Sequence, residues 1–274
     1  MSNALVEQWK IWQYAKGLSK RTVDDRAATV LRMAEGTMRQ PDSVNTGELV
    51  QWLAAGDWSP NTRWTYYTAL NAWFTWLQRL EHRADNPMLK IDSPRRRKGE
   101  PHPVSNADLR RLLRTRMHRR SRMMIILAAF QGLRVHEIAQ VKTEHFNIVE
   151  QTMTVVGKGG VKSVLPVHPR VLHIVYDMPK GFWFPGSDRG HQRRESISST
   201  IKEVMVRAGV PGSAHSLRHW FGTALVEAGV DLRTVQVLLR HQNLATTEIY
   251  TRITDERRAN AINRLELDQL AFVS

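Results

Sequence analysis

The 274-residue sequence contains no cysteine, which excludes disulfide bonds and thiolate metal sites. It also contains no long apolar segment: the longest run, residues 123–130, is well below the roughly 20 residues that a membrane-spanning helix needs. The first ten residues lack the basic-then-apolar pattern of a signal peptide. Internal repeats and low-complexity segments are absent as well. These absences predict a globular, cytoplasmic protein without a membrane partner.

Acidic side chains are in short supply. The chain has 26 Asp and Glu against 40 Lys and Arg, a formal net charge of +14 at pH 7. An excess of this size suits a polyanion, because phosphate contacts release the counterions condensed on nucleic acid. The basic residues are dispersed and form no amphipathic basic anchor for an anionic membrane. The charge therefore favours a nucleic-acid partner.

Tryptophan is unevenly distributed: seven of nine lie within the first 76 residues, which indicates two different parts of the chain. In residues 1–88 apolar side chains recur at helical spacing. Ser19 and Ser59 are suited to cap helices, the second just before Pro60, and Gly36 is expected to end the helix that Ser19 begins. The aromatic stripe after Pro60 is expected to be core rather than a base-stacking platform. Residues 1–88 are thus predicted to form a helical domain.

Prolines and like charges predict an extended linker over residues 89–104. Its basic run is expected to lie along a DNA backbone: Arg95, Arg96, Arg97 and Lys98. Ser105 then begins a helix, residues 153–167 read as a β-hairpin, and helices return from residue 197. The predicted fold is mainly α with a small antiparallel β-sheet, divided into the helical N-terminal domain and an α+β domain over residues 105–274.

Two short segments carry candidate chemistry before residue 200. In GLRVHEI, residues 132–138, Arg134 and Glu137 stand three apart on one helical face, a spacing that a plain surface ion pair also explains. In GKGG, residues 157–160, Lys158 lies at a hairpin tip where backbone can approach a ligand closely. The spacing of a nucleotide-binding P-loop is absent, and Lys162 on the next strand competes for any role given to Lys158.

Two further segments lie near the C-terminus. HSLRHW, residues 215–220, brings His215 and Arg218 to one side of a helix start. A metal site of His215, His219 and His241 is discounted, because no carboxylate or cysteine stands at ligand spacing beside them. In RHQNLATTEIY, residues 240–250, His241 precedes Tyr250 by nine positions. A tyrosine, with a pKa of about 10, attacks only where cations and proton carriers assist it.

The ordered set GLRVHE, GKGG, HSLRH and the His241–Tyr250 pair closely resembles the tyrosine recombinases, the family of phage integrases and Xer-type proteins. The resemblance covers residues 101–255 through these motifs and the first hundred residues only by their helical pattern. It implies a short, two-domain recombinase whose N-terminal domain binds the core-type site on DNA. It also implies phosphoryl transfer with no cofactor, neither ATP nor a metal.

The resemblance implies that Arg134 and Arg218 grip the nonbridging oxygens of the scissile phosphate, for which planar guanidinium forks are suited. It implies that His241 donates a hydrogen bond to the same phosphate. Glu137 is expected to stand behind these groups and position them.

The resemblance also assigns the groups that make and break bonds. Tyr250 is the implied nucleophile and forms a 3′-phosphotyrosyl link. His215 is implied to carry the proton of the tyrosine, and Lys158 to protonate the leaving 5′-oxygen.

Arg240 departs from the family pattern, which usually has glycine directly before the second histidine. If the backbone there is left-handed, arginine fits it worse than glycine. Alternatively, Arg240 adds a contact to a DNA phosphate.

The resemblance implies site-specific recombination by four protomers on two duplex DNA sites, giving integration or excision. Residues 256–274 either pack on their own domain or dock on a neighbouring protomer as an exchanged C-terminal tail. A directionality factor is a further candidate partner. An Xer-like chromosome or plasmid resolvase, a catalytically silent DNA-binding relative and a type IB topoisomerase are the alternatives.

Overall fold

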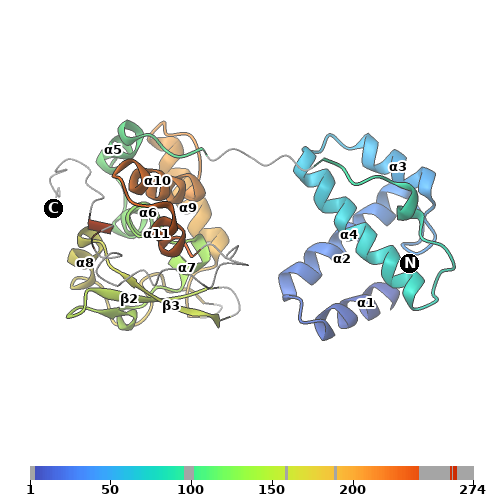
Figure 1. The fold of residues 1–274 in the computed structure, drawn as a ribbon, viewed down its shortest axis with the longest axis horizontal. Helices are drawn as coiled ribbons and strands as arrows, with labels where there is room; N and C mark the ends of the chain where they lie inside the picture. The colour runs from blue at the N-terminus through green and yellow to red at the C-terminus, as the bar shows by residue number, and fades with distance from the viewer. Residues whose placement is uncertain are drawn as a thin grey trace. The chain divides into compact units, whose positions relative to one another are not determined.

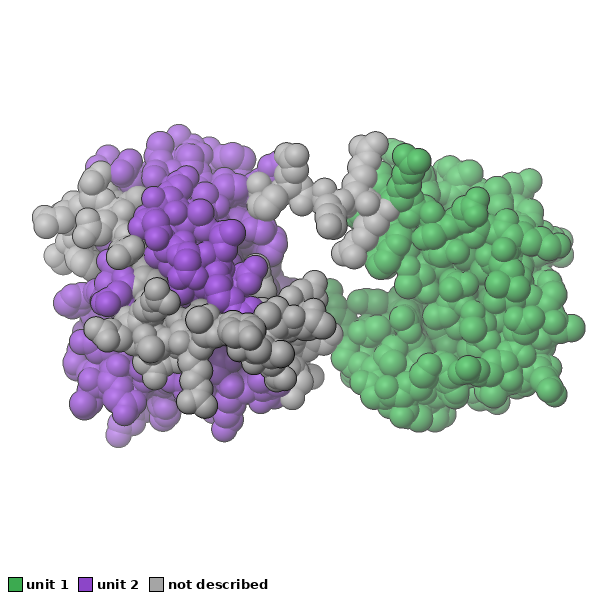
Figure 2. Space-filling model, viewed as in Figure 1, with its two compact units in different colours: residues 1–99 green, residues 100–274 purple. Residues whose placement is uncertain are grey.

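The computed structural model describes residues 4–95, 102–157, 160–187, 190–240, 260 and 262–263 (Figure 1). The chain divides into two compact units, residues 1–99 and 100–274, which Figure 2 shows in green and purple. None of the helices in these described ranges is long and apolar enough to cross a membrane.

The first unit is helical throughout its described part. Its elements are α1 (Ala4–Ala15), α2 (Lys20–Thr37), α3 (Thr46–Ala55), α4 (Pro60–Arg79) and a 3-10 turn, η1 (Pro87–Lys90). The predicted caps of α2 and α4 are confirmed: the hydroxyl of Ser19 accepts a hydrogen bond from the Thr22 amide, and that of Ser59 accepts one from the Thr62 amide. Pro60 then occupies the first turn of α4, where its missing N–H costs nothing.

Aromatic rings form the core of this unit. Trp9, Trp73 and Trp76 are almost fully buried, with Trp73 edge-on to Trp9 at 5.1 Å and stacked on Trp76 at 5.2 Å between ring centroids. The indole N–H of Trp73 donates to the carbonyl of Pro41 at 2.9 Å, so its one polar group is satisfied. The expected core role of the aromatic stripe is confirmed.

Two details differ from expectation. Helix α2 runs past Gly36 and ends at Thr37, and Met38, which caps it, has a left-handed φ of 52°. Gly36 instead permits close packing, because a Cβ there would lie 2.5 Å from the indole nitrogen of Trp52. The 3-10 turn of residues 87–90 extends into the expected linker, which begins at residue 89, and the Tyr67 hydroxyl donates to the carbonyl of Ile91, so the start of the linker packs on the first unit.

The second unit combines helices with a three-stranded antiparallel sheet of order β1-β2-β3. Its elements are α5 (Asn106–Arg114), α6 (Arg119–Phe130), α7 (Val135–Ala139), η2 (Thr143–His145), β1 (Phe146–Asn147), β2 (Thr152–Val156), β3 (Lys162–Pro166), α8 (Pro169–Val175), α9 (Arg194–Arg207), α10 (Ala214–Glu227) and α11 (Leu232–Leu238). The predicted fold class and the hairpin are confirmed, with Val156 opposite Lys162 at its end.

Helix α6 is the centre of the second unit. Its residues from Met123 to Phe130 are buried, and α8, α9 and α10 pack against it. A helix that is apolar on all sides is one that lies inside a domain. This buried helix fixes the turn at its C-terminal end, where the candidate site begins.

Candidate active site

A tight turn after α6 brings the first site residues into position. Gly132 has φ 60°, and a Cβ there would lie 2.7 Å from the Phe221 ring of α10, so both conformation and space require glycine. Two residues later Arg134 caps α7 with an extended backbone. The carboxylate of Glu137, one turn into α7, accepts a hydrogen bond from the Arg134 amide at 2.7 Å. The RVHE motif therefore folds its arginine and glutamate together locally.

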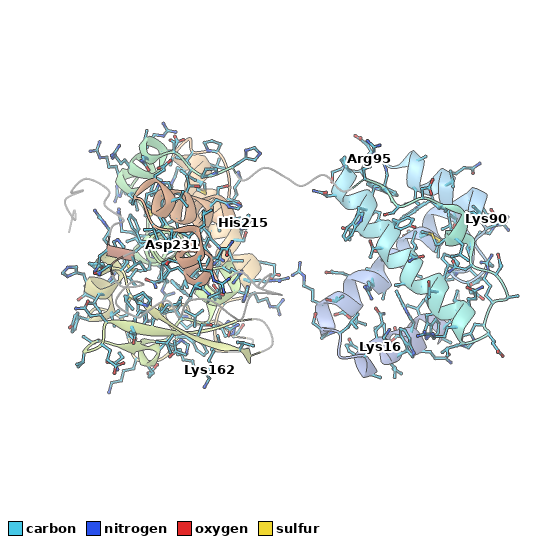
Figure 3. All side chains as sticks on the ribbon, viewed as in Figure 1. Lys16, Lys90, Arg95, Lys162, His215 and Asp231 are labelled. Atoms are coloured by element: carbon cyan, nitrogen blue, oxygen red, sulfur yellow. The ribbon has the colours of Figure 1, made fainter. Side chains whose placement is uncertain are left out.

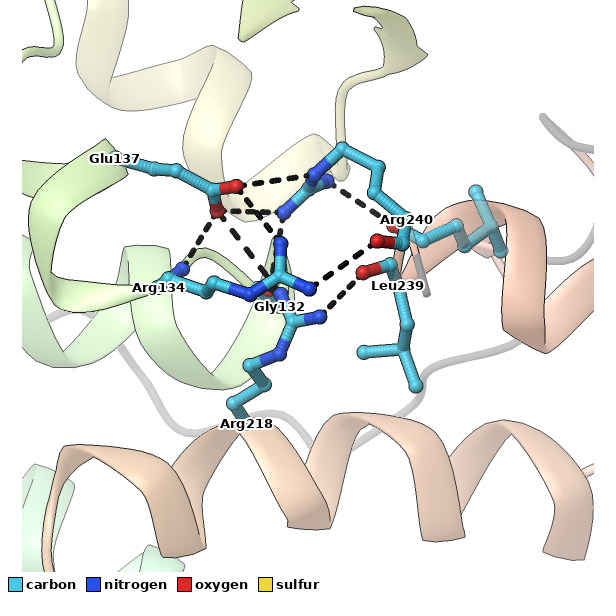
Figure 4. A network of polar contacts seen from close by, with 7 residues as sticks. Gly132, Arg134, Glu137, Arg218, Leu239 and Arg240 are labelled. Carbon is cyan, nitrogen blue, oxygen red and sulfur yellow. Dashed lines mark hydrogen bonds and ion pairs between the residues drawn. The ribbon is translucent and has the colours of Figure 1, made fainter. Parts of the chain in front are cut away.

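Glu137 is the centre of a cluster of three arginines (Figure 4). Its fully buried carboxylate accepts from Arg134 Nη1 at 3.0 Å and from Arg240 Nη2 at 2.7 Å. A third guanidinium, that of Arg218, lies 4.0 Å away. Arg134 and Arg218, which are 84 positions apart in the sequence, are thus brought to one carboxylate.

Arg218 reaches the cluster from α10, and its side chain is only 4% exposed. It donates to two backbone carbonyls, those of Gly132 and Leu239. Arg134, the most exposed of the three at 33%, donates through Nη2 to the carbonyl of Arg240 at 3.1 Å. The backbone of residues 239 and 240 therefore orients both arginines.

Arg240 adopts the left-handed backbone that the sequence analysis considered, with φ 51°. Its guanidinium points inward: it pairs with Glu137 and donates to the carbonyls of Leu238 at 3.0 Å and Gly132 at 3.4 Å. Its side chain is 10% exposed, and its described contacts lie within the second unit, around Glu137. Its position is that of an internal counter-ion.

The electrostatics of the cluster favour an anion. Burial by itself raises the pKa of Glu137, but the Arg240 charge and the Arg134 amide hydrogen bond outweigh it, so the pKa lies below its ordinary value. Burial, followed by the charges of Arg134 and Arg240, lowers the pKa of Arg218 to about 9, which leaves it cationic at pH 7. Three cations and one carboxylate give the cluster a net charge of +2, and guanidinium forks match the oxygens of a phosphate.

His215 and Lys162 lie in the described part of the second unit (Figure 3). His215 is exposed in the first turn of α10, and its ring contacts that of His219 edge-on at 4.1 Å between centroids. Burial, followed by the neighbouring charges of His215 and Arg218, lowers the pKa of His219. Lys162 is exposed at the start of β3. Within the described ranges, no group of three or more His, Asp or Glu is arranged to hold a metal ion.

The remaining predicted residues are those of the linker, the hairpin tip and the tyrosine segment. Arg95 is exposed at the end of the described part of the first unit. The other predicted site residues lie outside the described residues: Arg96, Arg97, Lys98, Lys158, His241 and Tyr250.

Three participants were not predicted from the sequence. The carbonyls of Gly132 and Leu239 serve as acceptors for Arg218, and Arg240 serves as the partner of Glu137. Backbone carbonyls leave no mark on residue identity. Arg240 did carry a signal, because it is an arginine at a position where a left-handed backbone favours glycine.

Comparison with known proteins gives the family. The model of the phage integrase family matches residues 104–257, which contain the whole arginine cluster and the tyrosine segment. The chain belongs to the phage integrase family. The tyrosine recombinase XerD of Pseudomonas putida is 30% identical to this chain, and the match covers 94% of this chain and 95% of XerD.

Solved structures agree with this membership. The integrase of mycobacterium phage Brujita is 61% identical, covers 97% of this chain and 93% of its own, and superposes with a TM-score of 0.59. A lambda integrase dimer bound to a core site is 14% identical and superposes with a TM-score of 0.74, covering 92% of this chain and 99% of the integrase chain. At this identity the likeness bears on the fold alone. As a tyrosine recombinase of this family, the chain is a site-specific DNA recombinase and hence an enzyme.

Proposed function

We propose that this recombinase cuts and rejoins duplex DNA through a phosphotyrosyl intermediate formed by Tyr250. The observation that carries the proposal is the meeting of Arg134 and Arg218 at Glu137, from two elements far apart in sequence. Their forks would hold the nonbridging oxygens of one phosphate, with His241 adding a third donor. Duplex DNA, whose backbone is a chain of phosphodiesters, is the polyanionic substrate that the net charge of +14 also favours.

The proposed step is a transesterification. The phenolic oxygen of Tyr250 attacks phosphorus, its proton passes to His215, and the P–O5′ bond breaks. Lys158 protonates the departing 5′-oxygen, which would otherwise leave as an alkoxide. The new ester retains the phosphodiester bond energy, so a 5′-hydroxyl from a second strand reverses the step without ATP.

The assembly follows from the same proposal. Four protomers would act on two core-type sites, with residues 256–274 docking on a neighbour and a directionality factor biasing the outcome. The proposed domains are residues 1–88 and 105–274, joined by the linker of residues 89–104. The DNA backbone would be contacted by the basic segment of the linker, Arg95, Arg96, Arg97 and Lys98, and more weakly by Lys162 in the second domain. The site of action would be DNA in a bacterial cytoplasm, whether or not a phage has infected the cell.

The relatives suggest two candidate biological outcomes. The 61% identity with a phage integrase favours integration and excision of a phage genome. The similarity to XerD over nearly its whole length keeps resolution of chromosome or plasmid multimers as the second candidate. Excision and integration assays on DNA bearing paired attachment sites, against a resolution assay on directly repeated sites, separate the two.

Covalent trapping tests the chemistry. On a nicked suicide substrate carrying the target site, the wild-type chain should form an adduct that survives SDS, and Tyr250→Phe should form none. Tyr176→Phe is the matched control, because that tyrosine is 69% exposed at the end of α8 and should leave the adduct unchanged. An adduct retained in Tyr250→Phe would refute the nucleophile, and relaxation of plasmids lacking the site would favour a topoisomerase instead.

A further inference from the structure

Arg240 stands at an energetically unfavourable position. Its φ of 51° lies in the left-handed region that an L-residue with a Cβ adopts at a cost and glycine adopts freely. Its side chain is also 10% exposed, so the guanidinium gives up most of its water. Burial accordingly lowers the pKa of Arg240, although the Glu137 charge opposes that effect. Contacts made by the side chain must offset both costs.

Apart from its hydrogen bond to the carbonyl of Leu238, the side chain of Arg240 contacts members of the cluster. Arg240 donates to both oxygens of Glu137, Nε to Oε1 at 3.3 Å and Nη2 to Oε2 at 2.7 Å. It also donates to the carbonyl of Gly132, the same carbonyl that accepts from Arg218. In return, its own carbonyl accepts from Arg134. Arg240 is therefore linked to all three other members of the cluster: to Glu137 directly, to Arg218 through the shared Gly132 carbonyl, and to Arg134 through its own carbonyl.

The charge balance shows what the side chain does. Without Arg240, the buried carboxylate of Glu137 would be neutralised by Arg134 and Arg218 alone, and the charge left for a phosphate would be close to one. With Arg240 bound to Glu137, the charges of Arg134 and Arg218 both remain available, since the cluster then carries +2. A phosphodiester gains negative charge as it is attacked, so the second positive charge acts most strongly in the transition state.

We propose that Arg240 is a positioning residue: it serves as the counter-ion of Glu137 and fixes the turn of residues 239–240, so that Arg134 and Arg218 keep their full charge for the scissile phosphate. The role rests on the proposed recombination chemistry. It differs from a direct DNA contact, because the guanidinium of Arg240 faces Glu137 rather than solvent. The turn also precedes His241, the first residue of the segment that carries Tyr250.

Single-turnover cleavage of saturating suicide substrate tests the role. Arg240→Gly suits the backbone but leaves Glu137 to draw on Arg134 and Arg218, so cleavage should slow by about tenfold or more, equivalent to about 1.4 kcal/mol on the barrier. The affinity for DNA and its salt dependence should stay unchanged, whereas loss of a phosphate contact would lower the salt slope by about one. A rate within twofold of the wild type, or a reduced salt slope, would overturn the role.

The double variant Glu137→Gln/Arg240→Gly separates charge from structure. Removing the carboxylate charge as well leaves Arg134 and Arg218 uncompensated, so the double variant should cleave faster than Arg240→Gly alone. A merely structural role predicts that the two losses accumulate, and a double variant slower than Arg240→Gly would overturn the proposal. Gln151→Gly is the control, because Gln151 has φ 50° and is exposed in the same unit away from the cluster; its rate should equal that of the wild type.

Arg240→Lys carries the test if the glycine variant does not fold. Lysine keeps the charge but not the planar fork, so the cleavage rate of Arg240→Lys should lie between those of the wild type and Arg240→Gly. If Arg240→Gly does not fold, the rate of Arg240→Lys should lie within tenfold of the wild-type rate. Loss of cleavage as complete as in Tyr250→Phe would exclude a role based on charge. The wild-type chain separates the two proposals. If the wild type forms no adduct, the proposed chemistry is overturned. If the wild type forms the adduct and Arg240→Gly cleaves at the same rate, only the role of Arg240 is overturned.

Discussion

The two units of the chain bury different kinds of side chain. The first buries indole and phenyl rings, and five ion pairs among its described residues each have a member at least 58% exposed. The second has a largely aliphatic core and, beside it, an ion-pair cluster in which Glu137 is fully buried and Arg218 almost so. Apolar burial favours folding directly, whereas a buried ion pair often contributes little or nothing to stability.

This difference indicates that the buried rings of the first unit and the buried charges of the second unit have different roles. The rings of the first unit account for its stability, and their loss should appear as unfolding. The charges of the second unit are retained at a desolvation cost, so their loss should appear mainly in catalysis.

Trp73→Ala should have the largest effect on stability. It removes a ring that is 0% exposed and packs on Trp9 and Trp76, so the first unit should lose about 3–5 kcal/mol of unfolding free energy. Urea denaturation followed by tryptophan fluorescence measures the loss, because seven of nine tryptophans lie in this unit. Ile11→Ala on α1, 68% exposed, should change stability by no more than about 0.5 kcal/mol. Similar losses in both variants would contradict the assigned core.

His136 should give a smaller effect that depends on pH. Its Nε2 is buried without a hydrogen-bond partner among the described residues, and burial lowers its pKa, with Glu137 opposing and Arg134 adding to the shift. Because the unfolded chain then binds the proton more tightly, the histidine stabilises the fold above about pH 6.5, and that contribution is lost as the pH falls further.

The test compares urea denaturation of the wild type and His136→Gln at pH 7.5 and pH 5.5. The wild type should lose more stability on acidification, by less than about 1 kcal/mol, since solvent still reaches part of the ring. An equal or larger loss in His136→Gln would show that this histidine is not the group that titrates.

Local signals allowed much of the fold to be predicted. Ser19 and Ser59 cap their helices as the sequence predicts, because a cap depends on residues within one turn. The prediction that Gly36 ends its helix was wrong, because glycine is needed there for close packing against Trp52, a residue that is near in space but not in sequence. Residues 89–91 were predicted to be linker, yet they pack on the first unit through the hydrogen bond from Tyr67 to Ile91, a contact between residues 24 positions apart.

The site was predictable only in its residue types. The family resemblance assigns Arg134, Glu137 and Arg218 to one site, and the structure places both arginine side chains within 4.0 Å of the Glu137 carboxylate. The inward turn of Arg240 was not predictable, because it depends on a carboxylate 103 positions away and on carbonyls whose direction the sequence does not encode. Pairings of this kind follow from the tertiary structure rather than from any local pattern.

The most direct test of the account is Arg218→Met, measured at once for stability and for cleavage. The side chain is 4% exposed, and its lowered pKa means that folding disfavours its charge. Methionine removes that penalty but also two hydrogen bonds to carbonyls, so the two effects should nearly cancel, within about 2 kcal/mol.

Adduct formation on the suicide substrate should nevertheless fall by roughly 10²- to 10³-fold, since a donor to the developing phosphate charge is lost. A stable Arg218→Met chain that no longer forms the adduct is the predicted result. A chain destabilised as strongly as Trp73→Ala, whose folded fraction still forms the adduct at the wild-type rate, would contradict the account.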